Sequence, residues 1–149
     1  MKLRHLAVLC LAPALAAFAA DAAPKIAPKD AAKLVAEGKA VLVDCREAPE
    51  WAESGVAAPA VLLPKSDFDG ERKKWNEFLA KNKGKQIIIY CRAGGRAATV
   101  AAALKAQGVN AANVGGLKDW QAAGLPVTPP PPEAGTATAR PEPRVPTKK

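Results

Sequence analysis

The sequence predicts an α/β fold, in which short buried strands alternate with helices around a parallel sheet. Two continuous apolar segments, residues 40–45 and 86–90, are typical of strands that are buried on both faces. An alanine-rich segment, residues 97–107, follows the second strand and is closed by Gly108, which predicts a helix with a glycine after its last turn. A strand, a short turn and a helix in this order indicate one unit of such a sheet.

The remaining segments fit the same alternation. On the N-terminal side, the sequence predicts a strand at residues 25–27, a helix from Pro28 to about Glu37 that ends at Gly38, a helical segment carrying Trp51 at residues 48–56, and a strand at residues 61–63. On the C-terminal side, it predicts a helix at residues 67–82, a strand at Asn113-Val114, a turn at Gly115-Gly116, and a final helix at residues 117–123 that carries Trp120. Within the helix at residues 67–82, the expected core side chains are Phe68, Trp75, Phe78 and Leu79.

Both ends of the 149-residue chain differ in composition from its middle. Residues 1–23 combine basic residues near the start with an apolar run at residues 6–20, a pattern typical of a cleaved signal peptide. The run is short for a bilayer span, although an uncleaved membrane anchor is the alternative. Residues 128–149 are rich in proline and are expected to form an extended or disordered tail. We therefore expect one domain at residues 24–127, periplasmic or secreted, without a stable membrane anchor after cleavage.

The net charge of +8 does not by itself indicate a nucleic-acid partner. The basic residues are spread along the chain, aromatic residues are few and no nucleic-acid-binding motif is present, so we expect no such partner. The positive charge would instead attract small anions. Nothing in the sequence indicates an oligomeric state.

The most informative segment is the turn after the strand at residues 86–90, which reads Cys91-Arg92-Ala93-Gly94-Gly95-Arg96. It places the cysteine at the carboxyl end of a strand, where ligands bind in open α/β sheets. Two adjacent glycines allow backbone N–H groups to converge on an anion, and the helix N-terminus adds a positive dipole. The guanidinium groups of the two arginines match oxyanions in charge and in hydrogen-bonding geometry. These features predict a nucleophilic thiolate at Cys91, and the alternative is an inert buried cysteine before an ordinary turn.

Few other groups remain for catalysis or metal binding. The only histidine, His5, lies in the predicted leader, which excludes a Cys-His dyad and histidine acid–base catalysis from the mature chain. Only Cys45 and Cys91 lie beyond the leader, and two cysteines are too few for a structural zinc site and form no Cys-x-x-Cys pair. We therefore expect neither a metal nor an organic cofactor.

The cysteine loop resembles the active-site loop of single-domain rhodaneses, a family of sulfurtransferases. Three further segments resemble that family in the same order: Val41-Leu42-Val43-Asp44-Cys45-Arg46-Glu47 resembles its strand ending in Asp-x-Arg-Glu, residues 55–64 more weakly resemble its Gly-His-Ile-x-Gly-Ala-x-x-x-Pro segment, and Gly115-Gly116, Trp120 and residues 124–127 resemble its closing stretch. The resemblance covers residues 25–127. It implies a three-layer α/β/α domain with a central parallel sheet of about five strands.

The same resemblance implies a reaction. A small anionic sulfur donor, thiosulfate or a persulfide, would load Cys91 as a persulfide, and a thiol or cyanide acceptor, in some cases a protein, would remove the sulfur. The implied site residues are the catalytic Cys91; the anion-binding loop Arg92, Ala93, Gly94, Gly95 and Arg96; the supporting pair Asp44 and Arg46; and the pocket-wall residues Gly116 and Leu117. For the supporting pair, the alternative is a helix N-cap at Asp44 and a surface ion pair of Arg46 with Glu47 or Glu50.

The length of the loop favours sulfur transfer. Relatives of this fold that act on phosphate or arsenate have five residues between the cysteine and the arginine, whereas four separate Cys91 from Arg96. The shorter loop is matched in the family to a persulfide sulfur. Two alternatives remain open: a module that carries sulfur or binds a partner without turnover, and a thiol redox or phosphatase-like enzyme.

Two positions depart from the family pattern. Val56 replaces its usual histidine, so local packing or substrate contacts are expected to differ. Cys45 stands between Asp44 and Arg46, where the family more often has an apolar or hydroxyl residue. Because that strand lies beside the one ending at Cys91 in the family's fold, one hypothesis is a reversible Cys45–Cys91 disulfide with Cys45 as resolving thiol. The alternation of side chains along the strand favours the other hypothesis, in which Cys45 is a core residue.

Overall fold

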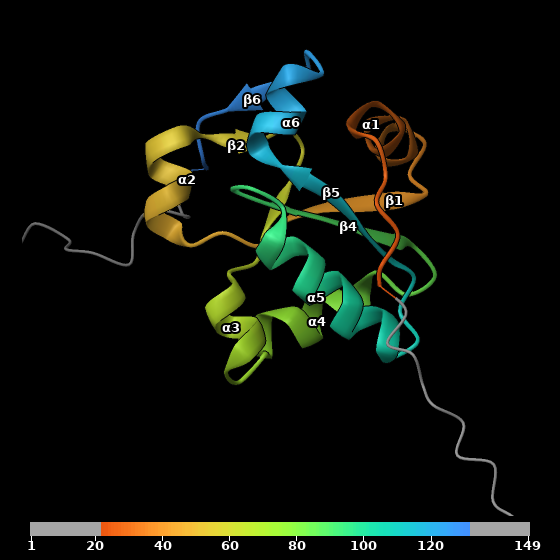
Figure 1. Ribbon diagram of the computed structural model, residues 1–149. Coiled ribbons are helices and arrows are strands. Elements are labelled where there is room, and N and C mark those ends of the chain that lie inside the picture. The colour runs from red at the N-terminus through yellow and green to blue at the C-terminus, as the bar shows by residue number, and fades with distance from the viewer. Residues whose placement is uncertain (1–21, 132–149) are drawn as a thin grey trace, which may run out of the picture.

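The computed structural model describes residues 22–131, which form a central parallel sheet with the strand order β3-β1-β4-β5 (Figure 1). These strands are β1 (Ala40–Asp44), β3 (Val61–Leu62), β4 (Gln86–Cys91) and β5 (Ala111–Gly116). The predicted α/β fold is confirmed, with four strands in the central sheet where about five were expected. Two further strands, β2 (Val56–Ala57) and β6 (Val127–Thr128), pair antiparallel in a separate small sheet, so the ordered fold reaches Thr128.

Helices cover both faces of the central sheet and make it the middle of three layers (Figure 1). On one face lie α1 (Pro28–Ala36) and α6 (Leu117–Ala122), and on the other lie α3 (Lys65–Asp69), α4 (Lys73–Lys81) and α5 (Gly95–Ala106). The remaining helix, α2 (Ala48–Ser54), follows β1 and carries the buried Trp51, as predicted.

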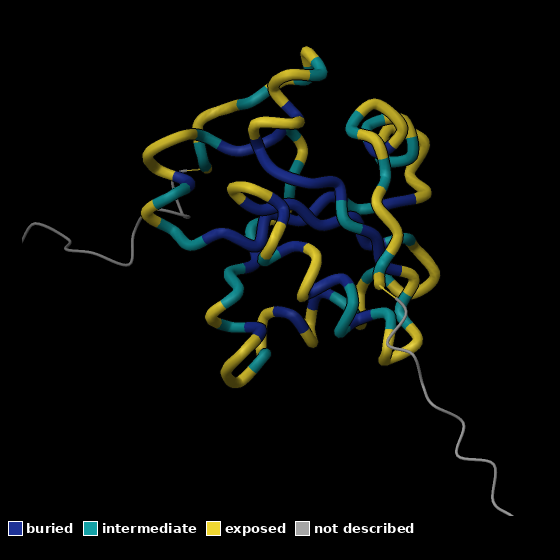
Figure 2. The backbone as a smooth tube through the Cα atoms, in the orientation of Figure 1, coloured by how far each residue is buried: buried dark blue, intermediate teal, exposed yellow. Residues whose placement is uncertain are grey.

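Successive side chains of the central strands enter opposite cores, as the twofold repeat of a strand requires. The core under α3, α4 and α5 receives Val43, Cys45, Ile87, Ile89 and Cys91, whereas the core under α1 and α6 receives Leu42, Ile88 and Tyr90. β1, β4 and β5 are buried along most of their length, whereas the edge strand β3 is partly exposed (Figure 2). Each large aliphatic side chain buried in this way contributes about 1.5–3 kcal/mol, so both cores hold β1 and β4 in place.

The single helix predicted at residues 67–82 is wrong, because the chain forms α3 and α4 with a break between them. Arg72, just before α4, has a left-handed backbone (φ 58°), and its N–H donates to the Asp67 carbonyl oxygen at 2.8 Å. The Asp67 carboxylate in turn accepts the Trp75 N–H at 3.2 Å and so satisfies the first turn of α4. The expected burial of Phe68, Trp75 and Phe78 is confirmed, whereas Leu79 is only partly buried against the same core.

Two short predictions near β5 are also corrected. Gly115-Gly116 is the end of β5 and not a turn, because a bulge shifts the pairing from Ile89 opposite Asn113 to Tyr90 opposite Gly115. Gly115 has φ +96° there, a left-handed backbone that glycine adopts without a Cβ penalty. The predicted strand at residues 25–27 is only an isolated parallel bridge between Lys25 and Asn113.

Apart from residues 22–23 and 128–131, the predicted leader and the predicted proline-rich tail lie outside the described residues. Across residues 22–131, no helix combines the length and the apolar character needed to cross a membrane.

Candidate active site

The site is built at the carboxyl end of β4. Cys91 is the last residue of that strand, and Arg92, Ala93 and Gly94 connect it to α5, which begins at Gly95. Gly94 has φ +93°, and this left-handed turn aims its N–H at the Cys91 sulfur, with a nitrogen–sulfur distance of 3.1 Å. Cys91 is only 2 % exposed, so its sulfur depends on the loop for stabilisation. The predicted strand, cysteine turn and helix are therefore brought together as expected.

The surroundings of Cys91 lower the pKa of its thiol to about 5. The largest cause is a hydrogen bond from the neighbouring Cys45 thiol; burial acts in the opposite direction, and the backbone N–H groups of Ala97, Ala93 and Gly94 lower the pKa further. A thiol with this pKa is a thiolate at neutral pH, which is the nucleophilic form. The same pairing and complete burial raise the pKa of Cys45, so Cys45 is the protonated member of the pair.

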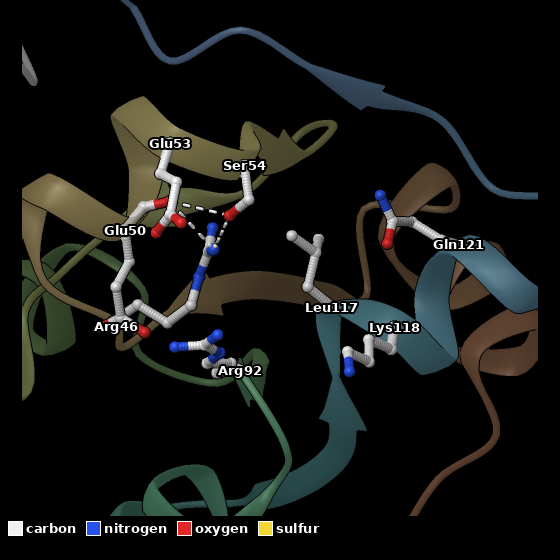
Figure 3. A pocket seen from close by; sticks show the side chains of 8 residues that line it. All are labelled: Arg46, Glu50, Glu53, Ser54, Arg92, Leu117, Lys118 and Gln121. Carbon is white, nitrogen blue, oxygen red and sulfur yellow. Dashed lines mark hydrogen bonds between the residues drawn. The ribbon is translucent and has the colours of Figure 1, made fainter.

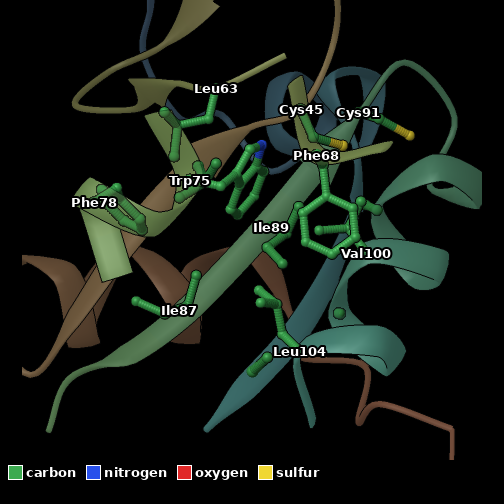
Figure 4. Packing of buried hydrophobic residues seen from close by; sticks show 14 residues of the cluster. Cys45, Leu63, Phe68, Trp75, Phe78, Ile87, Ile89, Cys91, Val100 and Leu104 are labelled. Carbon is green, nitrogen blue, oxygen red and sulfur yellow. The ribbon is translucent and has the colours of Figure 1, made fainter. Parts of the chain in front are cut away.

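The two cysteines occupy matching places on adjacent strands. Asp44 of β1 lies opposite Tyr90 of β4, and the Cys45 N–H donates to the Tyr90 carbonyl oxygen at 3.0 Å, which places Cys45 beside Cys91. Figure 4 shows both side chains at the same end of the sheet, above Phe68 and Ile89. Both sulfurs are free thiols in this structure.

Arg96 is held by an ion pair that the sequence analysis did not anticipate. Its two terminal nitrogens donate to the two carboxylate oxygens of Glu50 at 2.7 and 2.6 Å. This pairing is the main cause that lowers the pKa of Glu50 to about 2, although burial opposes it. Glu50 also accepts the Glu47 N–H at 3.1 Å and thereby caps α2. The Glu47-x-x-Glu50 spacing was the one signal in the sequence that could have located Glu50.

Asp44 and Arg46 form a buried pair that fixes the segment leading to α2. The Asp44 carboxylate accepts the Arg46 backbone N–H at 2.9 Å and its guanidinium at 2.7 Å. The same guanidinium donates to the Ser54 hydroxyl and the Gly55 carbonyl oxygen, both at 2.7 Å. Arg46 is 1 % exposed, which excludes the alternative of a surface ion pair. Removal of one partner from such a pair typically costs about 3–5 kcal/mol, because the other charge stays buried.

A cavity of about 150 Å³ adjoins the loop (Figure 3). It is lined by Arg46, Glu50, Glu53, Ser54, Arg92, Leu117, Lys118 and Gln121. Cys91 is not among the described residues that line it, but Arg92 follows Cys91 directly in the chain. Arg92 is exposed, and in Figure 3 Leu117 lies between the side chains of Arg92 and Lys118.

This cavity includes residues that the sequence analysis predicted and others that it missed. Arg92, expected as an anion-binding residue, and Leu117, expected as pocket wall, both line it, whereas Gly116, also expected as pocket wall, is not among its described lining residues. Lys118, Gln121 and Glu53 were missed, because no motif marks them and only the fold brings α6 and α2 to the same opening.

The fold and the site together define an α/β domain in which a cysteine loop follows a central parallel strand and leads into a helix. The sequence model of the rhodanese-like domain family matches residues 27–123, and the chain belongs to this family. No curated protein matches the chain.

Solved structures agree with this assignment. A rhodanese-like domain protein from Staphylococcus aureus is 30% identical, with a TM-score of 0.54 over 70% of this chain and 98% of that one. A rhodanese-related protein from Thermoplasma volcanium is 25% identical, with a TM-score of 0.59 over 70% and 97%. A human single-domain sulfurtransferase is 22% identical, with a TM-score of 0.54 over 67% and 96%, and shares the fold.

The first prediction concerns the titration of Cys91. We expect the thiolate absorbance of the reduced protein to rise through an inflection near pH 5, because the thiolate is present above its pKa and lost below it. Cys45→Ala should move the inflection to higher pH, since it removes the hydrogen bond that contributes most. Cys91→Ser is the control and should lack the transition. A wild-type inflection in the ordinary range of about pH 8–9 would contradict the assigned environment.

The second prediction uses the close approach of β5 to the loop. A Cβ at Gly116 would overlap the Arg92 carbonyl oxygen and lie 3.0 Å from the Ala93 Cα, so Gly116→Ala must displace the loop backbone. We expect the pKa of Cys91 to rise by on the order of one unit, because the N–H groups move away from the sulfur. Gly95→Ala is the matched control, since a Cβ there meets nothing within 4 Å. Equal titration curves for the two variants would show that Gly116 does not position the loop.

Proposed function

We propose that this protein is a sulfurtransferase that carries sulfane sulfur as a persulfide on Cys91. The observation that carries the proposal is the Cys91 thiolate, held at the end of β4 by the Gly94 N–H and by the neighbouring thiol. Membership of the rhodanese-like family supports it, as does the fold shared with a human single-domain sulfurtransferase.

In the first half-reaction, the Cys91 thiolate attacks the outer sulfur of thiosulfate. A sulfur–sulfur bond forms to Cys91, the bond between the two thiosulfate sulfurs breaks, and sulfite leaves with the electron pair. The outer sulfur of the new persulfide carries the negative charge. The N–H groups of Ala93, Gly94 and Ala97 surround the sulfur and favour the charged form, so the loop needs no general base.

In the second half-reaction, an acceptor removes the outer sulfur. A thiolate or cyanide attacks it, the bond to the Cys91 sulfur breaks, and Cys91 returns to its thiolate form, with a new persulfide or thiocyanate as the product. Donor and acceptor therefore bind in turn, in a ping-pong scheme. A thiol on a protein is an acceptor of the same chemical class.

The charged residues around the loop have different roles in this proposal. Arg92 is exposed on the cavity and Lys118 lines the same cavity, so these two cations attract the anionic donor. Arg96 is bound by Glu50, and we propose that it orients the start of α5 through this ion pair. Asp44 and Arg46 are buried together and support the segment that presents Glu50.

The setting of the reaction is part of the same proposal. The leader predicted for residues 1–23 would place the domain in the periplasm or outside the cell.

A carrier that loads sulfur once and waits for a partner remains the second candidate function, because a loaded persulfide is common to both. Turnover by the isolated protein with thiosulfate and cyanide separates the two.

The third prediction tests the central step. After thiosulfate treatment of the reduced protein, we expect one equivalent of sulfite and no sulfite from Cys91→Ser, because the serine hydroxyl cannot displace it. Addition of cyanide should then release thiocyanate on repeated turnover from the wild type alone. Sulfite release at equal rates from both proteins would refute Cys91 as the nucleophile.

The fourth prediction concerns donor capture. Arg92→Ala should raise KM for thiosulfate by about tenfold, corresponding to roughly 1.4 kcal/mol, with a smaller change in kcat, because the lost contact acts on donor binding. Lys83→Ala is the control, since this exposed lysine lines a separate cavity with Leu79 and Lys85. A KM for Arg92→Ala equal to that of the control would show that Arg92 does not bind the donor.

A further inference from the structure

The reaction just proposed leaves one reactive group of the site unused. Cys45 is fully buried, and its sulfur lies beside the nucleophile rather than among apolar side chains alone. A thiol in a core position needs no partner, but this one lies in the same core cluster as Cys91, at the matching position of the adjacent strand. Cys45 therefore places a second thiol beside any sulfur bound on Cys91.

The backbone already holds the two cysteines at a distance that a disulfide can span. The parallel pairing of β1 and β4 continues from Asp44 opposite Tyr90 to Cys45 beside Cys91. Neighbouring strands lie about 4.8 Å apart, and the Cα atoms of disulfide-bonded cysteines usually lie about 4.4–6.8 Å apart. Both side chains enter the same core cluster, so they point to the same side of the sheet. A bond between their sulfurs requires side-chain rotation and no change of strand register.

We propose that Cys45 is a resolving thiol, which converts the Cys91 persulfide into a Cys45–Cys91 disulfide and releases sulfide. The sulfur of Cys45 attacks the Cys91 sulfur, the persulfide bond breaks, and the outer sulfur departs with the electron pair and takes the Cys45 proton as HS⁻. The two cysteine sulfurs are oxidised by two electrons in total, and the sulfane sulfur is reduced by two. The persulfide is itself the oxidant, so this step needs no other oxidant.

This inference rests on the proposed function and adds an outcome to it. When a good acceptor is present, the outer sulfur is transferred to it. Without an acceptor, Cys45 attacks the persulfide, and the products are free sulfide and the Cys45–Cys91 disulfide. A dithiol reductant then restores both thiols, which makes the whole cycle a dithiol-dependent reduction of sulfane sulfur. Because Cys45 is inaccessible to solvent, it can act only on the sulfur of Cys91.

The charge states of the two sulfurs fit this order of events. Before loading, Cys91 holds the negative charge, and the raised pKa of Cys45 keeps its proton in place. After loading, the negative charge moves to the outer sulfur, which becomes the acceptor for that proton. Cys45 therefore stays a protonated thiol until a persulfide is present beside it.

The fifth prediction is a single-turnover experiment on the full chain. The reductant is removed from the reduced protein under anaerobic conditions, and thiosulfate is then added in the absence of any thiol or cyanide. Sulfite, sulfide and the intact mass are then followed together. We expect the wild type to release sulfite first and then one sulfide for each Cys45–Cys91 disulfide, identified by the loss of two hydrogens and by peptide mapping. The wild type incubated without thiosulfate should keep both thiols.

Cys45→Ser is the matched variant, because it keeps the size and a hydrogen-bond donor but cannot form the disulfide. We expect it to release sulfite, gain one sulfur on Cys91 and release no sulfide until a thiol is added. If the serine is poorly tolerated, Cys45→Ala gives the same comparison at a pH where its Cys91 is ionised, and the wild-type disulfide is a readout that needs no variant.

The outcomes separate this inference from the proposed function. Sulfite release followed by a lasting persulfide on wild-type Cys91, with no sulfide, would overturn the resolving role and leave the sulfurtransferase intact. Sulfide release equal in the wild type and Cys45→Ser would also overturn it. An absence of sulfite from the wild type would refute the proposed function itself and the resolving step with it.

Discussion

The parallel pairing of β1 with β4 is the interaction on which the rest of this structure depends. It is held from both faces by buried aliphatic side chains, and its register sets Asp44 opposite Tyr90 at the end where the site lies. From that one alignment follow the position of the Asp44–Arg46 pair, the start of the segment that carries Glu50, and the contact between the two cysteines. A slip of one residue would move every side chain of β1 to the opposite core.

The site contains two kinds of electrostatic groups that favour a negative charge. Backbone N–H groups and a neighbouring thiol act at the sulfur itself, where water is excluded, whereas the side chains of Arg92 and Lys118 lie on the adjoining cavity. Arg96, which the sequence predicted to bind an anion, forms an ion pair with Glu50 that joins α5 to α2. Preorganised dipoles are effective at the enclosed sulfur, whereas exposed side-chain charges on the cavity act on an anion at longer range.

The sequence was sufficient to predict the α/β class, the place of Cys91 and most helices, because hydrophobic period and glycine position are local properties. The sequence was insufficient where tertiary contacts determine the bounds of an element or the partner of a side chain. The break before α4 arises from hydrogen bonds of Asp67, and the extension of β5 through Gly115 arises from a bulge opposite Tyr90. Pairing of Arg96 with Glu50 joins residues 46 positions apart, and no spacing rule within a single element indicates it.

The division between an enclosed sulfur and cations on an adjoining cavity has a consequence for ionic strength. Salt ions screen exposed charges over a Debye length of about 8 Å under physiological conditions, but they act weakly on groups that are removed from water. Arg92 is exposed, so added salt will weaken its long-range attraction for an anion. Cys91 is 2 % exposed, and its hydrogen bonds operate without an intervening solvent layer. Salt therefore governs how often an anion reaches this protein, and not how reactive the sulfur is once the anion has arrived.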